Sequence, residues 1–118
     1  MKSVHPHRIA VVALPGVLAL EFGTATQVFG RDPHYDLTVC AESRAAPLPG
    51  SGIVIHTSAG LEGLKRAQTV IVPGYDDVNA TVSPAVLNAL RAAHTRGARL
   101  VSICSGAFAF AARTWSAL

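Results

Sequence analysis

Short apolar runs bounded by turn residues recur along the chain and predict buried strands. The first run, Ile9–Leu14, contains no polar residue and stops at Pro15-Gly16, which is typical of a strand covered on both faces. A second run, Thr69–Val72, stops in the same way at a Pro-Gly pair. Further strands are predicted over Leu37–Ala41, Ile53–Ile55 and Leu100–Cys104.

Between these runs, apolar residues return every three or four positions and predict helices. One such stripe starts at Leu18 and ends at Gly30, a residue that suits a helix C-terminus. A second helix is predicted to begin after Ser83, which can cap free N–H groups, with Pro84 in the first helical position. It ends at Gly97, because glycine adopts the left-handed conformation without strain.

The alternation of strands and helices predicts an α/β fold with a mostly parallel sheet. Strand-helix-strand units join parallel strands by right-handed crossovers, so that helices cover both faces of the sheet. In open sheets of this kind, ligands bind at the carboxyl ends of the strands. The residues that follow the predicted strands are therefore the first candidates for a functional site.

Length and composition fit one domain over residues 1–118. Half of the 118 residues are hydrophobic and only 14% are charged, whereas disordered chains are poor in apolar residues and rich in charge. No apolar run approaches the ~20 residues that a membrane span needs, and no secretory signal is evident. We therefore expect a cytoplasmic protein that does not enter a membrane.

Charge and cysteine content exclude several classes of site. The net charge of +3 comes from basic residues scattered along the chain, which argues against direct nucleic-acid binding by this segment. Cys40 and Cys104 lack the spacing of a zinc site or a disulfide framework. The glycine-containing loops match no phosphate-binding or dinucleotide-binding motif. We expect two free thiols, no metal and no cofactor.

The strongest chemical signal is the sequence SICSG over residues 102–106, where the last predicted strand turns into an apolar helix from about Ala107. Small residues around a central cysteine are the counterpart of the nucleophile elbow, in which a sharp turn presents the side chain at the sheet edge. The helix N-terminus would favour the Cys104 thiolate. The Ser105 N–H could stabilise an oxyanion, with a second donor from Gly74 or Tyr75.

Each candidate also has a structural interpretation. Cys104 could be a small residue that finishes a buried strand, and Cys40 is expected to be a packing residue. Glu21, near the end of the first strand, could orient a thiol or face water near a helix start. Nothing in the sequence places any of the five histidines beside Cys104, although a cysteine nucleophile normally needs such a base. The pair Asp76-Asp77 is assigned no chemistry.

The combined motifs resemble the ThiJ/PfpI superfamily, which has the class I glutamine amidotransferase-like fold. The resemblance covers the chain to about Ala112 and is greatest to the N-terminal domain of GlxA-type transcriptional regulators of the AraC family. It implies a flavodoxin-like three-layer sandwich that senses and dimerises, incomplete here at its C-terminus. The motifs that carry it are Val11–Val17, Leu20-Glu21, Val28-Phe29, Val70–Tyr75 and Ser102–Phe108.

The resemblance also implies roles for individual residues. Cys104 corresponds to the elbow cysteine, Glu21 to the acid that hydrogen-bonds the thiol, and Gly74 to the glycine on the oxyanion side. Tyr75 departs from the commoner second glycine. The superfamily's histidine lies downstream of the elbow, and no histidine follows Cys104 in this chain. We expect a truncated or frameshifted product, or a fragment, without a DNA-binding domain.

Three functions remain open. The first is the partial sensing domain of a GlxA-like regulator, with Cys104, Glu21, Gly74, Tyr75 and Ser105 around a small-molecule effector. The second is a ThiJ/PfpI-type cysteine-dependent hydrolase or glyoxalase-like enzyme, which the missing histidine makes the alternative. The third is a nonfunctional fragment with an exposed sheet edge and apolar helix faces, which would favour self-association.

Overall fold

A computed structural model describes residues 5–77 and 79–110 of the chain. Helical residues continue from 107 to 110. None of the helices within these ranges is long and apolar enough to cross a membrane. In chain order the elements are β1 (His7–Val12), α1 (Ala19–Gly30), β2 (Tyr35–Cys40), β3 (Ala45–Pro47), β4 (Val54–His56), the 3-10 helix η1 (Leu61–Arg66), β5 (Thr69–Val72), α2 (Pro84–Thr95), β6 (Arg99–Ser102) and the 3-10 helix η2 (Cys104–Gly106).

Four parallel strands form the main sheet in the order β2-β1-β5-β6. Ile9 of β1 is in register with Leu37 of β2 and with Thr69 of β5, and Val70 of β5 is in register with Leu100 of β6. The two middle strands, β1 and β5, contain the two most continuous apolar runs, because only the middle of a layered sheet is covered from both sides. β3 and β4 form a separate antiparallel pair.

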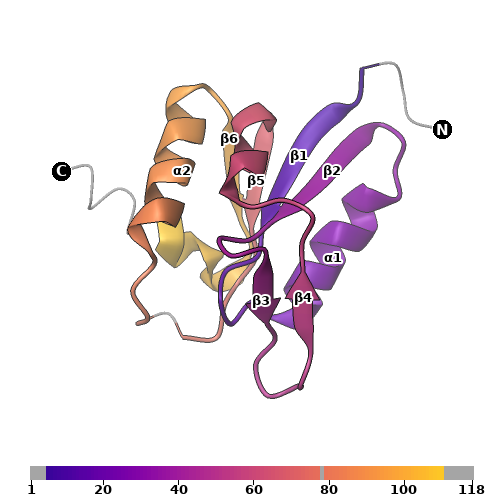
Figure 1. Cartoon of the computed structure of the whole chain (residues 1–118). Coiled ribbons are helices and arrows are strands. Elements are labelled where there is room, and N and C mark those ends of the chain that lie inside the picture. Colours follow the sequence, from indigo (N-terminus) through magenta and orange to yellow (C-terminus); the bar gives the residue numbers. More distant parts are fainter. Residues whose placement is uncertain (1–4, 78, 111–118) are drawn as a thin grey trace.

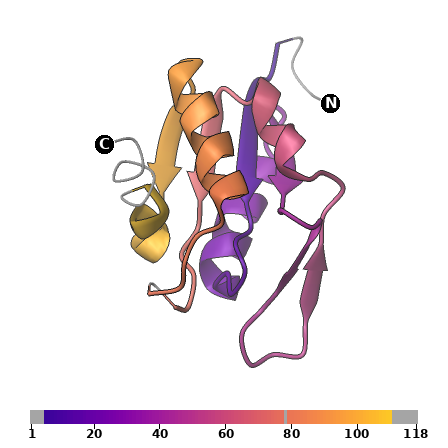
Figure 2. The same ribbon diagram turned by 60° about the vertical axis from the view of Figure 1, so that its left-hand side comes forward.

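Helices cover the sheet on both faces (Figures 1 and 2). α1 joins β1 to β2, and α2 joins β5 to β6, so that the two connections run in opposite directions from the middle of the sheet. Right-handed crossovers that run in opposite directions place their helices on opposite faces. The predicted α/β fold class, a flavodoxin-like sandwich with a mostly parallel sheet, is confirmed.

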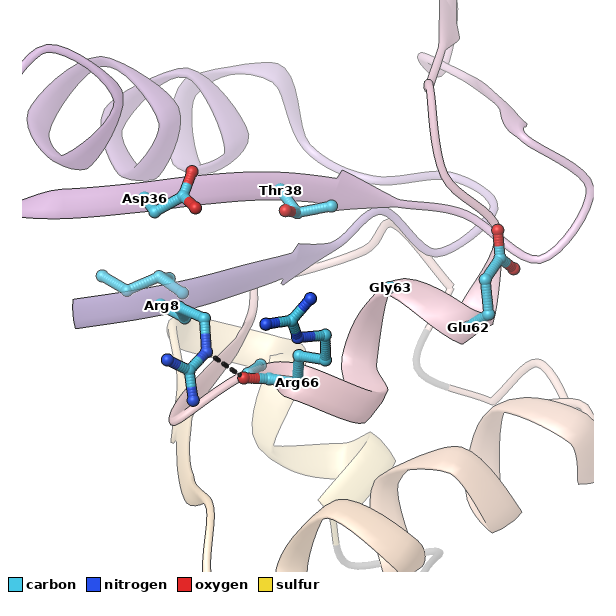
Figure 3. A pocket seen from close by; sticks show the side chains of 8 residues that line it. Arg8, Asp36, Thr38, Glu62, Gly63 and Arg66 are labelled. Carbon is cyan, nitrogen blue, oxygen red and sulfur yellow. Dashed lines mark hydrogen bonds between the residues drawn. The ribbon is translucent and has the colours of Figure 1, made fainter. Parts of the chain in front are cut away.

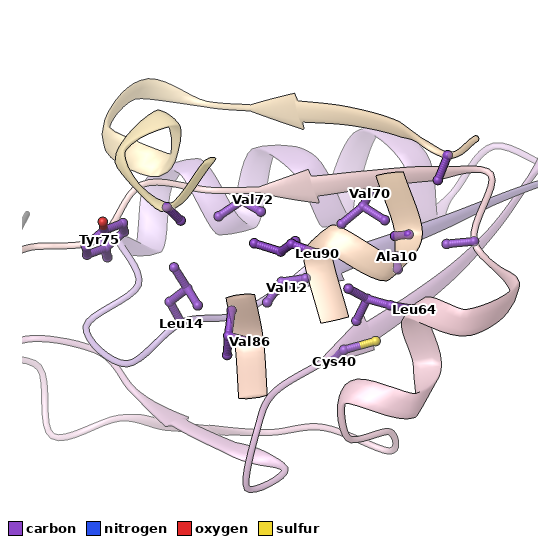
Figure 4. Close-up of a cluster of buried hydrophobic side chains, with 14 residues drawn as sticks. Ala10, Val12, Leu14, Cys40, Leu64, Val70, Val72, Tyr75, Val86 and Leu90 are labelled. Carbon is purple, nitrogen blue, oxygen red and sulfur yellow. The ribbon is translucent and has the colours of Figure 1, made fainter. Parts of the chain in front are cut away.

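The larger apolar core lies between the sheet, α2 and η1 (Figure 4). Alternate residues of β1 and β5, such as Val12 and Val70, face this side, while Val11 and Ile71 face α1 on the other side. Leu90 of α2 is fully buried against the sheet. The period of two in the strands thus divides one apolar run between two cores.

The start of α2 follows the sequence prediction. The Ser83 side chain accepts a hydrogen bond from the Val86 N–H at 3.2 Å, and Pro84 occupies the first helical position. The Ser83 hydroxyl also donates to Glu42 Oε1 at 2.8 Å. Gly97 has φ +97°, so the predicted left-handed residue after the helix is confirmed.

Several element boundaries differ from the prediction. β1 ends at Val12 rather than Leu14, because the chain turns toward Pro15-Gly16 after Val12. Ala13 and Leu14 lie outside the strand but are still buried. β6 ends at Ser102, and Cys104 already belongs to η2. The prediction missed β3 and η1 altogether, since a three-residue strand and a 3-10 helix are too short to show a period.

Candidate functional site

The candidate site lies at the carboxyl ends of the strands, where the loops after β1 and β5 meet. β1 and β5 are neighbours, and their connecting helices go to opposite faces, so this is the switch point at which open α/β sheets bind ligands. The Leu18 N–H donates to the Gly74 carbonyl at 2.9 Å, and the Asp76 N–H to the Gly16 carbonyl at 3.0 Å. An antiparallel bridge between Val17 and Tyr75 completes the link.

Cys104 sits on a sharp bend immediately beyond β6. Its φ is +54°, a conformation that residues with a Cβ rarely adopt and that commonly marks a functional position. The Ile103 N–H donates to the Val72 carbonyl at 3.1 Å, so the bend starts directly at the sheet edge. The Cys104 side chain is exposed. The structure thus places an exposed thiol on a strained bend at the carboxyl end of the sheet.

Gly106 allows the bend to pack against the end of β5. A Cβ at this position would overlap the Val72 carbonyl oxygen and would lie 2.9 Å from the Val72 carbonyl carbon and 3.3 Å from that of Pro73. The obstacle is backbone in each case, so it cannot rotate away as a side chain would. Glycine at position 106 is therefore a condition for this elbow.

Glu21 projects from the first turn of α1 over Gly74. A Cβ at Gly74 would overlap Glu21 Oε2 and would lie 2.7 Å from the Ser105 hydroxyl oxygen, so the carboxylate and the hydroxyl converge on one point. Glu21 Oε2 is buried and has no hydrogen-bond partner among the described residues. A buried carboxylate oxygen without a partner is costly, and it marks a place for a hydrogen-bond donor.

Ser105 fastens the bend to the loop after β5. Its hydroxyl accepts a hydrogen bond from the Tyr75 N–H and donates to the Tyr75 carbonyl, both at 3.0 Å. The Tyr75 N–H is thus engaged within the protein, and the backbone amides of Gly74 and Ser105 are the candidate oxyanion donors. The Tyr75 ring is buried in the core on the α2 side, where burial and then the charge of Asp77 raise the pKa of its phenol.

A small hollow of about 110 Å³ opens beside these turns, toward the start of α2. It has room for only a few non-hydrogen atoms. Its walls are mainly apolar, and Glu42 and Ser83 supply the polar groups at its rim. The residues that line it include Leu14, Pro15, Tyr75, Val82 and Val86.

Four histidines lie at the opposite end of the sheet from Cys104. His5 and His7 stand at the start of β1, His34 precedes β2, and His94 is in the last turn of α2 before β6. His56 is exposed on β4. The described residues contain no group of three or more histidine, cysteine, aspartate or glutamate side chains that could hold a metal ion.

Comparison with known proteins shows where this fold occurs. No family model matches the chain, and no curated protein matches it. The structure is similar to a ThiJ/PfpI family protein from Pseudomonas syringae, with a TM-score of 0.80 and 20% identity over 92% of this chain and 46% of that one. It is also similar to DJ-1beta of Drosophila melanogaster, with a TM-score of 0.79 and 23% identity over 92% of this chain and 61% of that one.

An AraC family transcriptional regulator from Pseudomonas putida has the same fold, with a TM-score of 0.76 and 16% identity over 93% of this chain and 62% of that one. The structural neighbours are thus DJ-1, ThiJ and PfpI proteins and include a regulator, in agreement with the resemblance of the motifs. At these identities the similarity establishes the fold. The chain spans between 46% and 62% of the length of these three neighbours.

Proposed function

We propose that the chain is the sensing and dimerisation part of a GlxA-like transcriptional regulator of the AraC family, that it acts in the cytoplasm, and that this segment does not itself bind nucleic acid. The observation that carries the proposal is the geometry after β6: Cys104 is exposed on a strained bend, and the next residue, Ser105, converges on Gly74 with a Glu21 oxygen that has no partner among the described residues. The histidines near the start of β1, before β2 and in the last turn of α2 lie at the other end of the sheet. Such a site can hold a ligand but lacks the usual base for catalysis. The AraC family neighbour supports this assignment.

The effector would be a small molecule with a hydrogen-bond donor. Glu21 Oε2 needs such a donor, and a hydroxyl, amide or ammonium group above Gly74 would supply one. The amides of Gly74 and Ser105 would meet an acceptor on the same molecule, and Cys104 would border it. Tyr75 contributes the buried wall.

Self-association belongs to the same proposal. On the α1 side, a hollow of about 510 Å³ leaves part of β5 and β6 uncovered, and its apolar lining includes Ile71, Val101 and Ile103. β6 also forms one edge of the sheet in the described part of the chain. Open strand edges and apolar faces favour pairing between chains, so a second copy would cover this side.

The test of the regulator assignment is the gene. We expect the gene that encodes this chain to encode a helix-turn-helix domain as well. A gene that encodes no such domain in any frame would contradict the assignment while leaving the geometry of the bend at Cys104 unaffected.

A thiol-dependent enzyme is the alternative, and the strained, exposed Cys104 favours it. In that case the thiolate would add to a carbonyl carbon, and the carbonyl oxygen would take the negative charge. Turnover of a small dicarbonyl compound by wild-type protein, Cys104→Ser and Cys40→Ala separates the two functions. The regulator proposal predicts no turnover above the uncatalysed rate in any of the three. Turnover that only Cys104→Ser abolishes would establish the enzyme instead.

A further inference from the structure

A third cavity, of about 270 Å³, lies between η1 and the strands β1 and β2 (Figure 3). Arg8 and Asp36 reach it from near the starts of these strands, so it belongs to the opposite end of the sheet from Cys104. Its polar lining comprises Arg8, Asp36, Thr38, Glu62 and Arg66.

Two arginines, Arg8 and Arg66, line this cavity together with two carboxylates, Asp36 and Glu62. Arg66, the last residue of η1, turns its guanidinium back toward the strands (Figure 3). Arg8 Nε donates to the Arg66 carbonyl at 2.7 Å, which leaves the terminal N–H groups of Arg8 for another partner. The Arg66 guanidinium forms no ion pair within residues 5–77 and 79–110. A guanidinium that lines a cavity without a carboxylate partner can bind an anion there.

Both acidic residues that line the cavity take part in interactions. Glu62 Oε1 accepts hydrogen bonds from the Gly60 N–H at 3.0 Å and from Arg44 at 3.1 Å, and these bonds, led by the one from Gly60, lower the pKa of the Glu62 carboxyl. Asp36 also has an interaction partner. Glu62 is thus held by Gly60 and Arg44, and its carboxylate forms no ion pair with Arg66 among the described residues.

Close packing of η1 on β2 shapes the cavity. A Cβ at Gly63 would overlap the Cys40 sulfur and would lie 3.2 Å from the Thr38 methyl carbon. Glycine thus allows η1 to approach the strand closely enough for Arg66 to line the same cavity as Thr38, which adds a hydroxyl to the wall.

We propose that this cavity binds a small oxyanion, the phosphate or carboxylate group of a metabolite-sized ligand, through Arg66 and Arg8. The guanidinium fork matches both groups, since it offers two parallel N–H donors to two oxygens. The site is separate from the elbow and would give the domain a second ligand. The sequence shows only the pair Lys65-Arg66, because Arg8 and Thr38 join it through the tertiary fold alone.

The proposal is tested by NMR titration of the full chain with inorganic phosphate and, separately, with acetate, at constant ionic strength. We expect saturable shifts of the Gly63 and Ala67 amides in wild-type protein with at least one of the two anions, and the tighter one identifies the chemistry. Arg66→Gln should weaken binding about tenfold or more. Lys65→Gln is the matched control, because it removes a neighbouring charge that does not line the cavity, and it should change affinity less than about twofold.

Amide shifts that rise linearly with the concentration of both anions would overturn the proposal. Equal loss of anion affinity in Arg66→Gln and Lys65→Gln would also overturn it, because it would indicate a general effect of charge. Arg66→Lys provides a second variant should Arg66→Gln lose its folded spectrum. It keeps the charge without the fork, and we expect intermediate affinity. Unchanged anion affinity in both Arg66→Lys and Arg66→Gln would show that Arg66 does not bind the anion.

Discussion

Replacing Gly106 by alanine is expected to lower the free energy of unfolding by about 2–3 kcal/mol, the upper range for overpacking a filled site. The new Cβ would overlap the Val72 carbonyl oxygen. Relief requires a shift of β5 or of the bend that holds Cys104, because neither obstacle is a flexible side chain. Urea unfolding followed by circular dichroism gives the difference.

Gly23→Ala is the matched control for this substitution. Gly23 lies within α1, and a Cβ there would meet nothing within 4 Å. Alanine is the better helix residue by about 1 kcal/mol, so this variant should be more stable than wild type. If Gly106→Ala unfolds at the same urea concentration as wild type, the close packing of the elbow on β5 is wrong.

The two thiols are expected to react with iodoacetamide at rates that differ by about 100-fold or more at pH 8. Cys104 is exposed, whereas Cys40 is buried beside Gly63. Burial, and after it the charge of Glu62, raises the pKa of the Cys40 thiol from 9.0 to about 11. At pH 8 only about one in a thousand Cys40 side chains would be a thiolate, and access to that thiolate is blocked as well.

The raised pKa of Cys40 also makes the stability of the folded protein depend on pH. The folded state keeps the Cys40 proton above the pH at which the unfolded chain releases it. The contribution of this thiol to the free energy of unfolding is therefore complete below pH 9 and is lost as pH rises from 9 toward 11.

Peptide mapping of alkylated protein measures the labelling rates of Cys40 and Cys104. Comparable labelling of Cys40 and Cys104 in folded protein would contradict the burial of Cys40.

Features encoded by local residues could be predicted from the sequence. Pro15-Gly16 ends the first apolar run independently of the tertiary structure. The Ser83 cap with Pro84 likewise depends only on the first turn of α2. The bend at Cys104 was predictable for the same reason, since small neighbours on either side permit a turn there.

Features assembled by the tertiary fold could not be predicted. β3 is three residues long and contains Pro47, which weakens any strand pattern. The sequence pointed to Tyr75 as a possible backbone donor, but only the structure shows that its N–H is bonded to Ser105. The cavity with Arg8 and Arg66 needs η1 to pack on β2, and no spacing along the chain reveals that contact.

The Cys104 thiol is accessible at the bend after β6, and its alkylation rate in folded protein tests this most directly. Because Cys104 is exposed, we predict a rate at pH 7 within about threefold of the rate in urea-unfolded protein. Glu21→Gln, which changes a carboxylate that lies over Gly74, should leave the rate within the same range. Glu42→Gln, which changes a carboxylate bonded to Ser83 instead, should leave the rate unchanged. A rate more than about tenfold below that of the unfolded chain, or a Cys104 as protected as Cys40, would contradict the exposure of Cys104.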